Sequence, residues 1–389
     1  MSNIFVKKAN NNIVKELNKI GFDTSYIVEA SSKYEGQLYK IFNLKPHEAN
    51  ILKQLCLSLG FDCAVNRDTI MCKCETTDAI IFATNSQLKK LIKKLYIQPF
   101  RLKEIAKELN FQLNEKVESI AIRNRIFDWS RPYIMGILNI TPDSFSDGGN
   151  YNSVESALIH CGELIKNGAD IIDIGGESTR PGAEKINTEE EINRVIPVIK
   201  EIREKYSDIP ISIDTRNYET AKNAIEMGAD IINDVSGLDF DKKLFDFVVK
   251  KNIPTIIMHS DKVPAVSTDF VNADIVEEVY ISLKDKIELL VDSGLTRKNI
   301  IIDVGIGFGK SVESNFELLK RLDEFQSLKC PILLGISRKS FIRKTFNVTC
   351  EEADLHTALY SSMLSNVNIH RVHNVELTKK FLNIAQKLY

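Results

Sequence analysis

The chain has 389 residues, of which 43% are hydrophobic and 27% charged, and its net charge is −2 at neutral pH. This composition is typical of a globular protein long enough for two domains, and no global property indicates nucleic-acid binding. The charge is uneven, since residues 1–125 hold 20 Lys and Arg against 13 Asp and Glu, whereas the rest holds 31 against 40.

Seven cysteines occur without a signal peptide and without an apolar run of about 18 residues, which predicts a reducing, cytoplasmic setting and no membrane span. Cys72 and Cys74 are two residues apart, so on a strand they would share a face. Their spacing differs from the Cys-x2-Cys pair of zinc sites. Free cysteines are therefore expected, with a metal site as the less favoured alternative.

Residues 1–125 have the pattern of a small α/β domain. The pattern predicts a short helix at 12–20, strands at 38–44 and 78–84, one or two strands within 61–74, and helices at 47–60, 86–95 and 102–109. No set of groups in this region could carry out chemistry, so we expect a binding, docking or interface role. Residues 114–130 form a charged connection, in which 123–129 are expected to form a short strand that covers the floor of the second domain.

From Tyr133 onward, short apolar strands alternate with amphipathic helices. The predicted strands are 133–140, 170–176, 211–215, 230–236, 254–259, 299–305, 331–337 and 368–374, and helices are expected at 154–168, 189–206, 218–228, 241–251 and 275–294. Eight strands of this kind predict a (β/α)8 TIM barrel over 126–389. An open doubly wound sheet is the alternative, but no G-x-G-x-x-G follows the first strand.

Polar residues follow or end nearly every predicted strand. They are Asn139, Glu177, Asp214, Asn233, His259, Asp303, Ser337, and Arg371 with His373. In a barrel, the carboxyl ends of all strands converge on one mouth. A single polar strand end could cap a helix, but a full set that includes carboxylates within apolar runs is costly to bury unless a ligand pairs with it.

Two groups within this set predict two kinds of ligand. Asp214, Asn233 and Asp303 are acceptors suited to the amide-guanidine edge of a flat heterocycle, although Asp234 could share the role of Asn233. Lys339, Arg371 and His373 are basic and lie near the seventh and eighth strands, where this fold binds phosphate. A solvated basic turn is the alternative for Arg338 and Lys339.

Two loops that hold Gly and Pro, one containing 143–146 and the other containing 178–182, are expected to act as lids that exclude water. The run 305–310, Gly-Ile-Gly-Phe-Gly-Lys, lacks the P-loop spacing. Phe308 within it is a candidate flat wall for an aromatic ligand.

Seven motifs in this order carry a resemblance to a known family. They are MGILNITPDSFSDGG, DIGGESTRPGA, ISIDT, INDVSG, DVGIGFGK, LLGISRKSF and RVHNV, and over residues 130–389 the chain resembles the dihydropteroate synthases of folate biosynthesis. The resemblance implies a transferase that joins 4-aminobenzoate to 6-hydroxymethyl-7,8-dihydropterin diphosphate and releases pyrophosphate. It also implies a homodimer, a Mg2+ requirement and competition by sulfonamides.

The resemblance assigns roles residue by residue. Asp214, Asn233 and Asp303 would hold the pterin, Lys339 would line both substrate sites, Arg371 and His373 would bind the diphosphate, and Asn139 would contact its Mg2+. Asp143 would lie near the diphosphate and Phe145 over the ring. Thr179, Arg180, Pro181, Phe308, Gly309 and Ser340 would shape the loops and the aminobenzoate pocket. The catalytic set would be Lys339, Asp303, Asp143, Arg371 and His373.

The sequence departs from the family pattern at Asn374, at 260–264 and at His356. These departures would affect contacts at the rim of the site and the dimer interface, and none lies in the catalytic set. Two rival interpretations remain open. A pterin-dependent methyltransferase would pass a methyl group to a corrinoid and would not need the anion site. A non-catalytic barrel scaffold would not need to keep every polar strand end.

Overall fold

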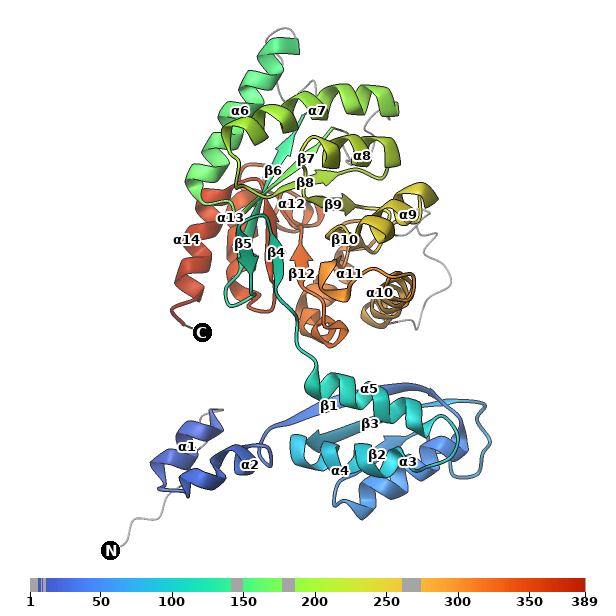
Figure 1. The fold of residues 1–389 in the computed structure, drawn as a ribbon. Coiled ribbons are helices and arrows are strands. Elements are labelled where there is room, and N and C mark those ends of the chain that lie inside the picture. The colour runs from blue at the N-terminus through green and yellow to red at the C-terminus, as the bar shows by residue number, and fades with distance from the viewer. Residues whose placement is uncertain are drawn as a thin grey trace, which may run out of the picture. The chain divides into compact units, whose positions relative to one another are not determined.

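The computed structural model describes residues 6, 7, 9, 12–140, 150–176, 186–260 and 274–388 (Figure 1). The chain divides into two compact units, Met1–Lys116 and Val117–Tyr389, which are described separately below. The division falls nine residues before the expected boundary between 125 and 126. No helix in the described ranges is long and apolar enough to cross a bilayer.

Unit 1 (Met1–Lys116) is a small α/β domain, as predicted. Its sheet has the antiparallel order β1-β3-β2. The elements are α1 (Ile13–Lys19), η1 (Thr24–Tyr26), α2 (Ile27–Ser31), β1 (Gly36–Leu44), α3 (Pro46–Ser58), β2 (Cys63–Val65), β3 (Thr77–Thr84), α4 (Asn85–Leu95) and α5 (Leu102–Asn114). Alternation along β3 buries Ala79, Ile81 and Ala83 against α3, α4 and α5.

The expectation that Cys72 and Cys74 share a strand face is wrong. Both follow the end of β2, in turns, and Cys72 has a left-handed φ of 52° that a strand does not permit. All seven cysteines are free. Within the described ranges, no group of three or more His, Cys, Asp or Glu side chains could hold a metal ion.

Unit 2 (Val117–Tyr389) contains the predicted closed barrel of eight parallel strands. They are β6 (Tyr133–Asn139), β7 (Ile171–Gly175), β8 (Ile211–Asp214), β9 (Ile231–Asp234), β10 (Thr255–Met258), β11 (Ile300–Asp303), β12 (Ile332–Leu334) and β13 (Ile369–Val372). The last strand pairs with the first, with Arg371 opposite Met135. This closure excludes the open sheet.

Helices surround the barrel (Figure 1). They are α6 (Asn150–Asn167), α7 (Thr188–Lys205), α8 (Tyr218–Glu226), α9 (Lys242–Lys251), α10 (Ile275–Asp292), α11 (Val312–Lys320), α12 (Ser340–Phe346), α13 (Ala353–Met363) and α14 (Val375–Ala385), with short 3-10 helices at Arg297–Asn299 and Leu322–Leu328. Outward strand residues such as Leu138, Ile172 and Ile232 pack against these helices in one large core.

A hairpin of β4 (Ile120–Ile122) and β5 (Arg125–Phe127) closes the floor of the barrel. Its buried Ile120, Ile122 and Phe127 join the inward side chains at the lower ends of the barrel strands. The floor strand expected at 123–129 is therefore confirmed, and it is one arm of a hairpin. This packing explains why the compact unit starts at Val117.

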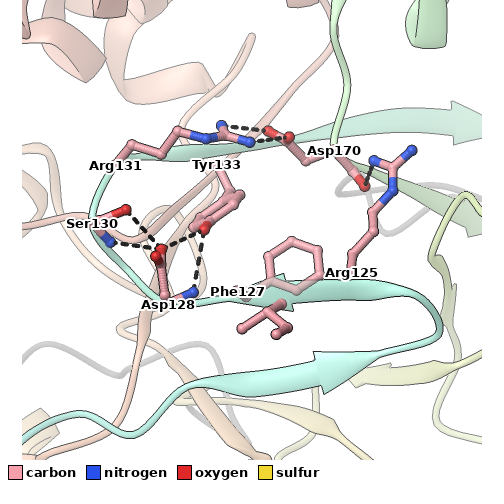
Figure 2. Close-up of a pocket in the computed structure, with 8 residues that line it drawn as sticks. Arg125, Phe127, Asp128, Ser130, Arg131, Tyr133 and Asp170 are labelled. Carbon is pink, nitrogen blue, oxygen red and sulfur yellow. Dashed lines mark hydrogen bonds and ion pairs between the residues drawn. The ribbon is translucent and has the colours of Figure 1, made fainter.

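One ion pair and several hydrogen bonds hold the chain beside this hairpin (Figure 2). Arg131 forms a bidentate pair with Asp170, with N–O distances of 2.6 and 3.2 Å, and Arg125 donates to the Asp170 carbonyl at 3.2 Å. Asp170 also accepts the N–H of Ile134 at 2.9 Å. These contacts surround a pocket at the amino ends of the strands, the end of the barrel opposite to the predicted site.

Candidate active site

On four strands, the side chains that point into the barrel change from apolar to polar between one inward position and the next. Side chains two residues apart share a face. The buried floor residues Ile171, Ile231, Ile301 and Ile369 are followed at that spacing by Asp173, Asn233, Asp303 and Arg371. The sequence therefore builds a polar layer directly above an apolar floor, on the side of the floor toward the carboxyl ends of the strands.

Arg371 is the centre of this layer. Its Nε donates to Oδ2 of Asp173 and its Nη2 to Oδ2 of Asp214, both at 2.6 Å. The amide of Asn233 lies 3.4 Å from both carboxylate oxygens of Asp173. Four strands, β7, β8, β9 and β13, thus contribute to one network of side chains.

Asp173 is the member of this network that sequence reasoning missed. It lies in the middle of β7 and is completely buried, whereas the predicted site residues are polar residues at the ends of strands. The usable signal was a carboxylate within the apolar run DIIDIGG. A buried carboxylate needs a partner, and here the partner is the cation on the last strand.

Asn233, and not Asp234, faces the mouth. Asp234 points to the other side of β9 and accepts hydrogen bonds from Ser236 N–H at 2.7 Å and Leu238 N–H at 3.0 Å. Asp234 therefore shapes the turn after β9, and Asn233 alone joins the polar layer.

Two glycines lie among the polar groups and show which of these groups are close together. A Cβ added at Gly335 would lie 3.8 Å from Oδ2 of Asp303 and 3.9 Å from Cδ of Arg371. A Cβ added at Gly175 would lie 3.4 Å from Oδ1 of Asn139. Asn139, Asp303 and Arg371, predicted from separate strands, therefore all line the same mouth.

Burial changes the acidity of the two strand-end carboxyls. Burial raises the pKa of Asp214 to about 7, although the charge of Arg371 opposes this shift. Burial also raises the pKa of Asp303, against the opposing charge of Lys339. For Arg371, burial acts to lower the pKa, but the charges of Asp173 and Asp214 outweigh it, so the pKa is raised and the side chain stays cationic.

Lys339 lies between the polar layer and the loop after β11. Its ammonium donates to the carbonyl of Ile306 and lies 4.4 Å from the ring centroid of Phe308. Burial lowers the pKa of Lys339 to about 8, although Asp303 opposes the shift. Lys339 is thus a half-buried cation beside an aromatic wall, and the alternative of a solvated basic turn does not apply to it.

His373 and Ser337 are joined across β12 and β13. The Oγ of Ser337 lies 2.9 Å from Nδ1 of His373 and accepts its backbone N–H at 3.2 Å. This contact places His373 on the same edge of the mouth as Arg371. Ser340, the first residue of α12, is exposed, and so is Gly309.

Arg338 is structural. It has a left-handed φ of 59° and forms two hydrogen bonds with Asp354 of α13, at 2.8 and 2.9 Å. Asn374 accepts the N–H of Leu377 at 3.0 Å and so caps α14, and its amide lies 3.5 Å from Asp354. The departure at Asn374 therefore keeps a capping role at the rim.

Five predicted site residues lie outside the described residues. They are Asp143, Phe145, Thr179, Arg180 and Pro181, and the same holds for Glu177 and for 261–264. The two predicted lids therefore stay predictions.

The described side chains offer two complementary sets of groups. Carboxyl and amide oxygens at Asp214, Asn233 and Asp303 can accept hydrogen bonds from a planar ligand. Cationic and donor groups at Lys339, Arg371 and His373 can receive an anion at the adjacent edge. Such a mouth can bind a heterocycle and stabilise a departing anion.

Comparison with known proteins places this site in context. The profile of the family described as pterin binding enzyme matches residues 135–373. A dihydropteroate synthase from Clostridium beijerinckii is 46% identical over 248 residues, which cover 63% of this chain and 90% of that protein. A structure of dihydropteroate synthase from Clostridium difficile in the presence of pteroic acid has a TM-score of 0.63 and 41% identity, and the match covers 67% of this chain and 97% of that one.

A longer alignment reaches into unit 1. A probable bifunctional folylpolyglutamate synthase/dihydropteroate synthase from Halobacterium salinarum is 38% identical over 347 residues. These residues cover 88% of this chain and 42% of that protein. Because unit 2 alone is shorter than this alignment, part of unit 1 has a counterpart in the halobacterial protein.

Proposed function

Because the chain belongs to the pterin-binding enzyme family, we propose that it is a dihydropteroate synthase, a transferase of folate biosynthesis. It would condense 6-hydroxymethyl-7,8-dihydropterin diphosphate with 4-aminobenzoate to give 7,8-dihydropteroate and pyrophosphate. The observation that carries the proposal is the polar layer at the mouth, in which acceptors for a pterin lie beside cations for a diphosphate.

The pterin would bind through its amide-guanidine edge. Asp303 of β11 is a buried carboxyl, the side chain of Asp214 of β8 is 10% exposed, and Asn233 adds an amide. A carboxylate can accept two parallel hydrogen bonds from a planar N–H/NH2 pair. A bound pterin would supply donors to these oxygens and offset the unfavourable burial of their charge.

The diphosphate would bind at Lys339, Arg371 and His373. Arg371 already gives Nε to Asp173 and one Nη to Asp214, so its remaining Nη group can donate to a phosphate oxygen. Lys339 supplies a compact charge, and the ring of His373 is oriented by Ser337. These groups would stabilise the negative charge that collects on the leaving pyrophosphate.

Asn139 is the described residue that could hold Mg2+ here. Its Oδ1 lies beside Gly175 at the mouth, and no carboxylate cluster for a metal occurs among the described residues. One amide oxygen is compatible with an ion that arrives on the diphosphate, because Mg2+ keeps several waters and takes oxygens from substrate phosphates. The ion would neutralise charge on the leaving group.

We infer a dissociative substitution at the pterin methylene carbon. The bond from this carbon to the diphosphate oxygen breaks, and the oxygen keeps the electron pair. The anionic oxygens of Asp214 and Asp303 favour the cationic pterin that remains. The amine nitrogen of 4-aminobenzoate, lying against Phe308, then forms the new C–N bond and loses a proton.

The barrel presents a surface suited to a homodimer, which we propose as its assembly. Leu355, Leu359 and Met363 lie four residues apart on α13 and are 53%, 46% and 65% exposed. His356, one of the departures from the family pattern, stacks on Phe346 beside them with ring centroids 4.6 Å apart. Leu359→Asp should halve the mass measured by analytical ultracentrifugation.

The free state of all seven cysteines supports a reducing setting, and we place the reaction in the cytoplasm. A structure of the Yersinia pestis dihydropteroate synthase contains a sulfonamide drug. We expect sulfonamides to compete with 4-aminobenzoate at Phe308 and Lys339 of this chain.

The decisive experiment is an assay of the full chain with both substrates and Mg2+, in which pyrophosphate and dihydropteroate are quantified. Equal amounts of the two products are expected. Arg371→Ala should weaken diphosphate binding and leave 4-aminobenzoate affinity nearly unchanged. Methyl transfer to a corrinoid without pyrophosphate release would overturn the proposal in favour of the pterin-dependent methyltransferases.

A further inference from the structure

The loop between β11 and α11 is held on one side by the buried Ile306 and by Asn315, whose Oδ1 accepts the Gly307 N–H at 2.7 Å, but three of its residues are glycines. Residues 304–311 contain Gly305, Gly307 and Gly309, whose φ angles of 70°, 82° and 67° are left-handed. Glycine adopts this conformation without steric cost but adds no packing of its own. The loop carries Phe308, so its position decides where the aromatic wall of the site lies.

The ammonium group of Lys310 lies close to three main-chain carbonyl oxygens, two of which belong to this loop. Its Nζ lies 3.0 Å from the Gly305 carbonyl oxygen, 3.2 Å from that of Phe308 and 3.4 Å from that of His259. An ammonium has three donors and no acceptor, so it suits three converging carbonyls. Without a cation, the negative ends of these carbonyl dipoles would repel one another.

The contact with His259 ties the loop to a neighbouring strand. His259 follows β10, and its N–H donates to the Asp303 carbonyl at 3.1 Å. A Cβ at Gly305 would lie only 1.8 Å from the His259 carbonyl oxygen, so the two backbones touch. Lys310 therefore fastens the loop at the place where it passes closest to β10.

The far side of the same loop contacts Lys339. The Ile306 carbonyl accepts from the Lys339 ammonium, and the Phe308 ring lies 4.4 Å below that ammonium. The Phe308 carbonyl is held by Lys310. The main-chain carbonyl of Phe308 is thus held by Lys310, and the ring of Phe308 lies against Lys339.

We propose that Lys310 is a positioning residue for the synthase reaction. It holds the 304–311 loop in the position in which Phe308 and Lys339 can both contact 4-aminobenzoate. The inference rests on the proposed function. Lys310 contacts no substrate in this account, and its ammonium is engaged by the main chain.

The test compares Lys310→Met and Lys310→Arg with the matched control Lys320→Met on α11. The Lys320 side chain is 73% exposed and 3.7 Å from Glu317. A misplacement of about 1 Å can reduce the rate about 100-fold, so Lys310→Met should lower kcat/KM for 4-aminobenzoate by about 10- to 100-fold. Its KM for the pterin diphosphate should change less than its KM for 4-aminobenzoate, because Asp214, Asn233 and Arg371 lie on other strands and Lys339 is the group that the two substrate sites share.

Lys310→Arg keeps the charge and should recover part of the activity, whereas Lys320→Met should match the parent protein. If Lys310→Met lowered the Tm but kept both KM values and kcat, the role would be purely structural and the proposal would be overturned. Equal loss for both substrates would overturn it as well.

Hydrogen exchange of the 304–311 amides provides a second measurement that does not depend on turnover. Faster exchange in Lys310→Met than in Lys320→Met is expected. Unchanged exchange would overturn the proposal. An inactive parent protein with this exchange difference would instead refute the proposed function and leave the loop assignment standing.

Discussion

Buried carboxyl groups in the two units differ in how completely the chain satisfies them. Glu48 of α3 is 2% exposed and accepts hydrogen bonds from the Lys45 N–H at 2.8 Å and from three Arg101 donors at 2.6 to 3.2 Å. Within the described part of the chain, Asp303 accepts one, from the Gly305 N–H at 2.8 Å. Asp214 likewise accepts one described hydrogen bond, from Arg371.

The pKa values follow this difference. Burial acts to raise the pKa of Glu48, but the hydrogen bonds outweigh it and lower the pKa to about 2. At Asp214, burial prevails and raises the pKa to about 7. A buried carboxylate that its own chain saturates stabilises the fold, whereas one with acceptor capacity left is prepared for a ligand.

Asp214→Asn is expected to have the largest effect on activity without lowering the stability of the fold. We expect a loss in kcat/KM of about 1000-fold, since each charge-assisted hydrogen bond contributes roughly 1.5–3 kcal/mol and the pterin would lose up to two. The Tm at pH 8 should not fall. The folded pKa lies above the unfolded value of 3.8, so ionising Asp214 makes the fold less stable as pH rises from about 4 to about 7.

Turnover assays and thermal unfolding at pH 5 and pH 8 check this prediction. A variant with near-parent turnover would show that Asp214 does not hold the pterin. A large fall in Tm at pH 8 would mean that Asp214 belongs with Glu48 as a structural group.

Phe127→Ala tests the floor of the barrel. Phe127 is 1% exposed and packs with Met135 and Tyr133, so its removal should lower the free energy of unfolding by about 3–5 kcal/mol. Ile126, the next residue, is 68% exposed, and Ile126→Ala should change this free energy by about 0.5 kcal/mol or less. Urea denaturation measures both free energies of unfolding. Equal effects of the two substitutions would show that Phe127 does not stabilise the floor of the barrel.

Glu48→Gln should destabilise unit 1 by about 2–3 kcal/mol without changing turnover, because the lowered pKa reflects that much stabilisation of the carboxylate. This contribution is present above the unfolded pKa of 4.5 and is lost as pH falls towards about 2. The matched control is Glu75→Gln, whose side chain is 93% exposed. Denaturation at pH 7 and pH 3 gives the comparison, and a difference that persists undiminished at low pH would contradict it.

A chain that starts at Val117 should show the smallest effect of all, with unchanged kcat and KM. Every described site residue lies in unit 2, and this start retains the floor hairpin. A start at Ile126 would remove β4 and is expected to unfold the barrel. Lost turnover in a folded Val117 variant would assign unit 1 a part in the reaction.

The two units also differ in surface. Among the described residues, 16 of the 28 exposed large hydrophobic side chains lie in unit 1, the smaller unit, including Leu38 and Phe82 side by side on the open face of its sheet. The alignment that reaches into unit 1 indicates that part of this region has a counterpart in the probable bifunctional folylpolyglutamate synthase/dihydropteroate synthase of Halobacterium salinarum. The docking role predicted for residues 1–125 stays a prediction.

Periodicity alone determined the order of the barrel strands, the floor strand and the polar strand ends. The positions of Asp214 and Asp303 at strand ends place them at the mouth from the sequence alone, whereas Asn233 and its neighbour Asp234 both stayed candidates for the third acceptor. The same rule could not identify Asp173, because its importance depends on a partner 198 residues away.

The tertiary structure decided which charges meet. Closure of β13 against β6 brings Arg371 across the barrel to Asp173 and Asp214, and the turn before α12 directs Arg338 away to Asp354. A lysine or arginine in a sequence has the same charge wherever it lies, but its partner depends on which strands the closed barrel arranges around one interior. The local pattern therefore determines the face of each side chain, and the closed barrel determines its contacts.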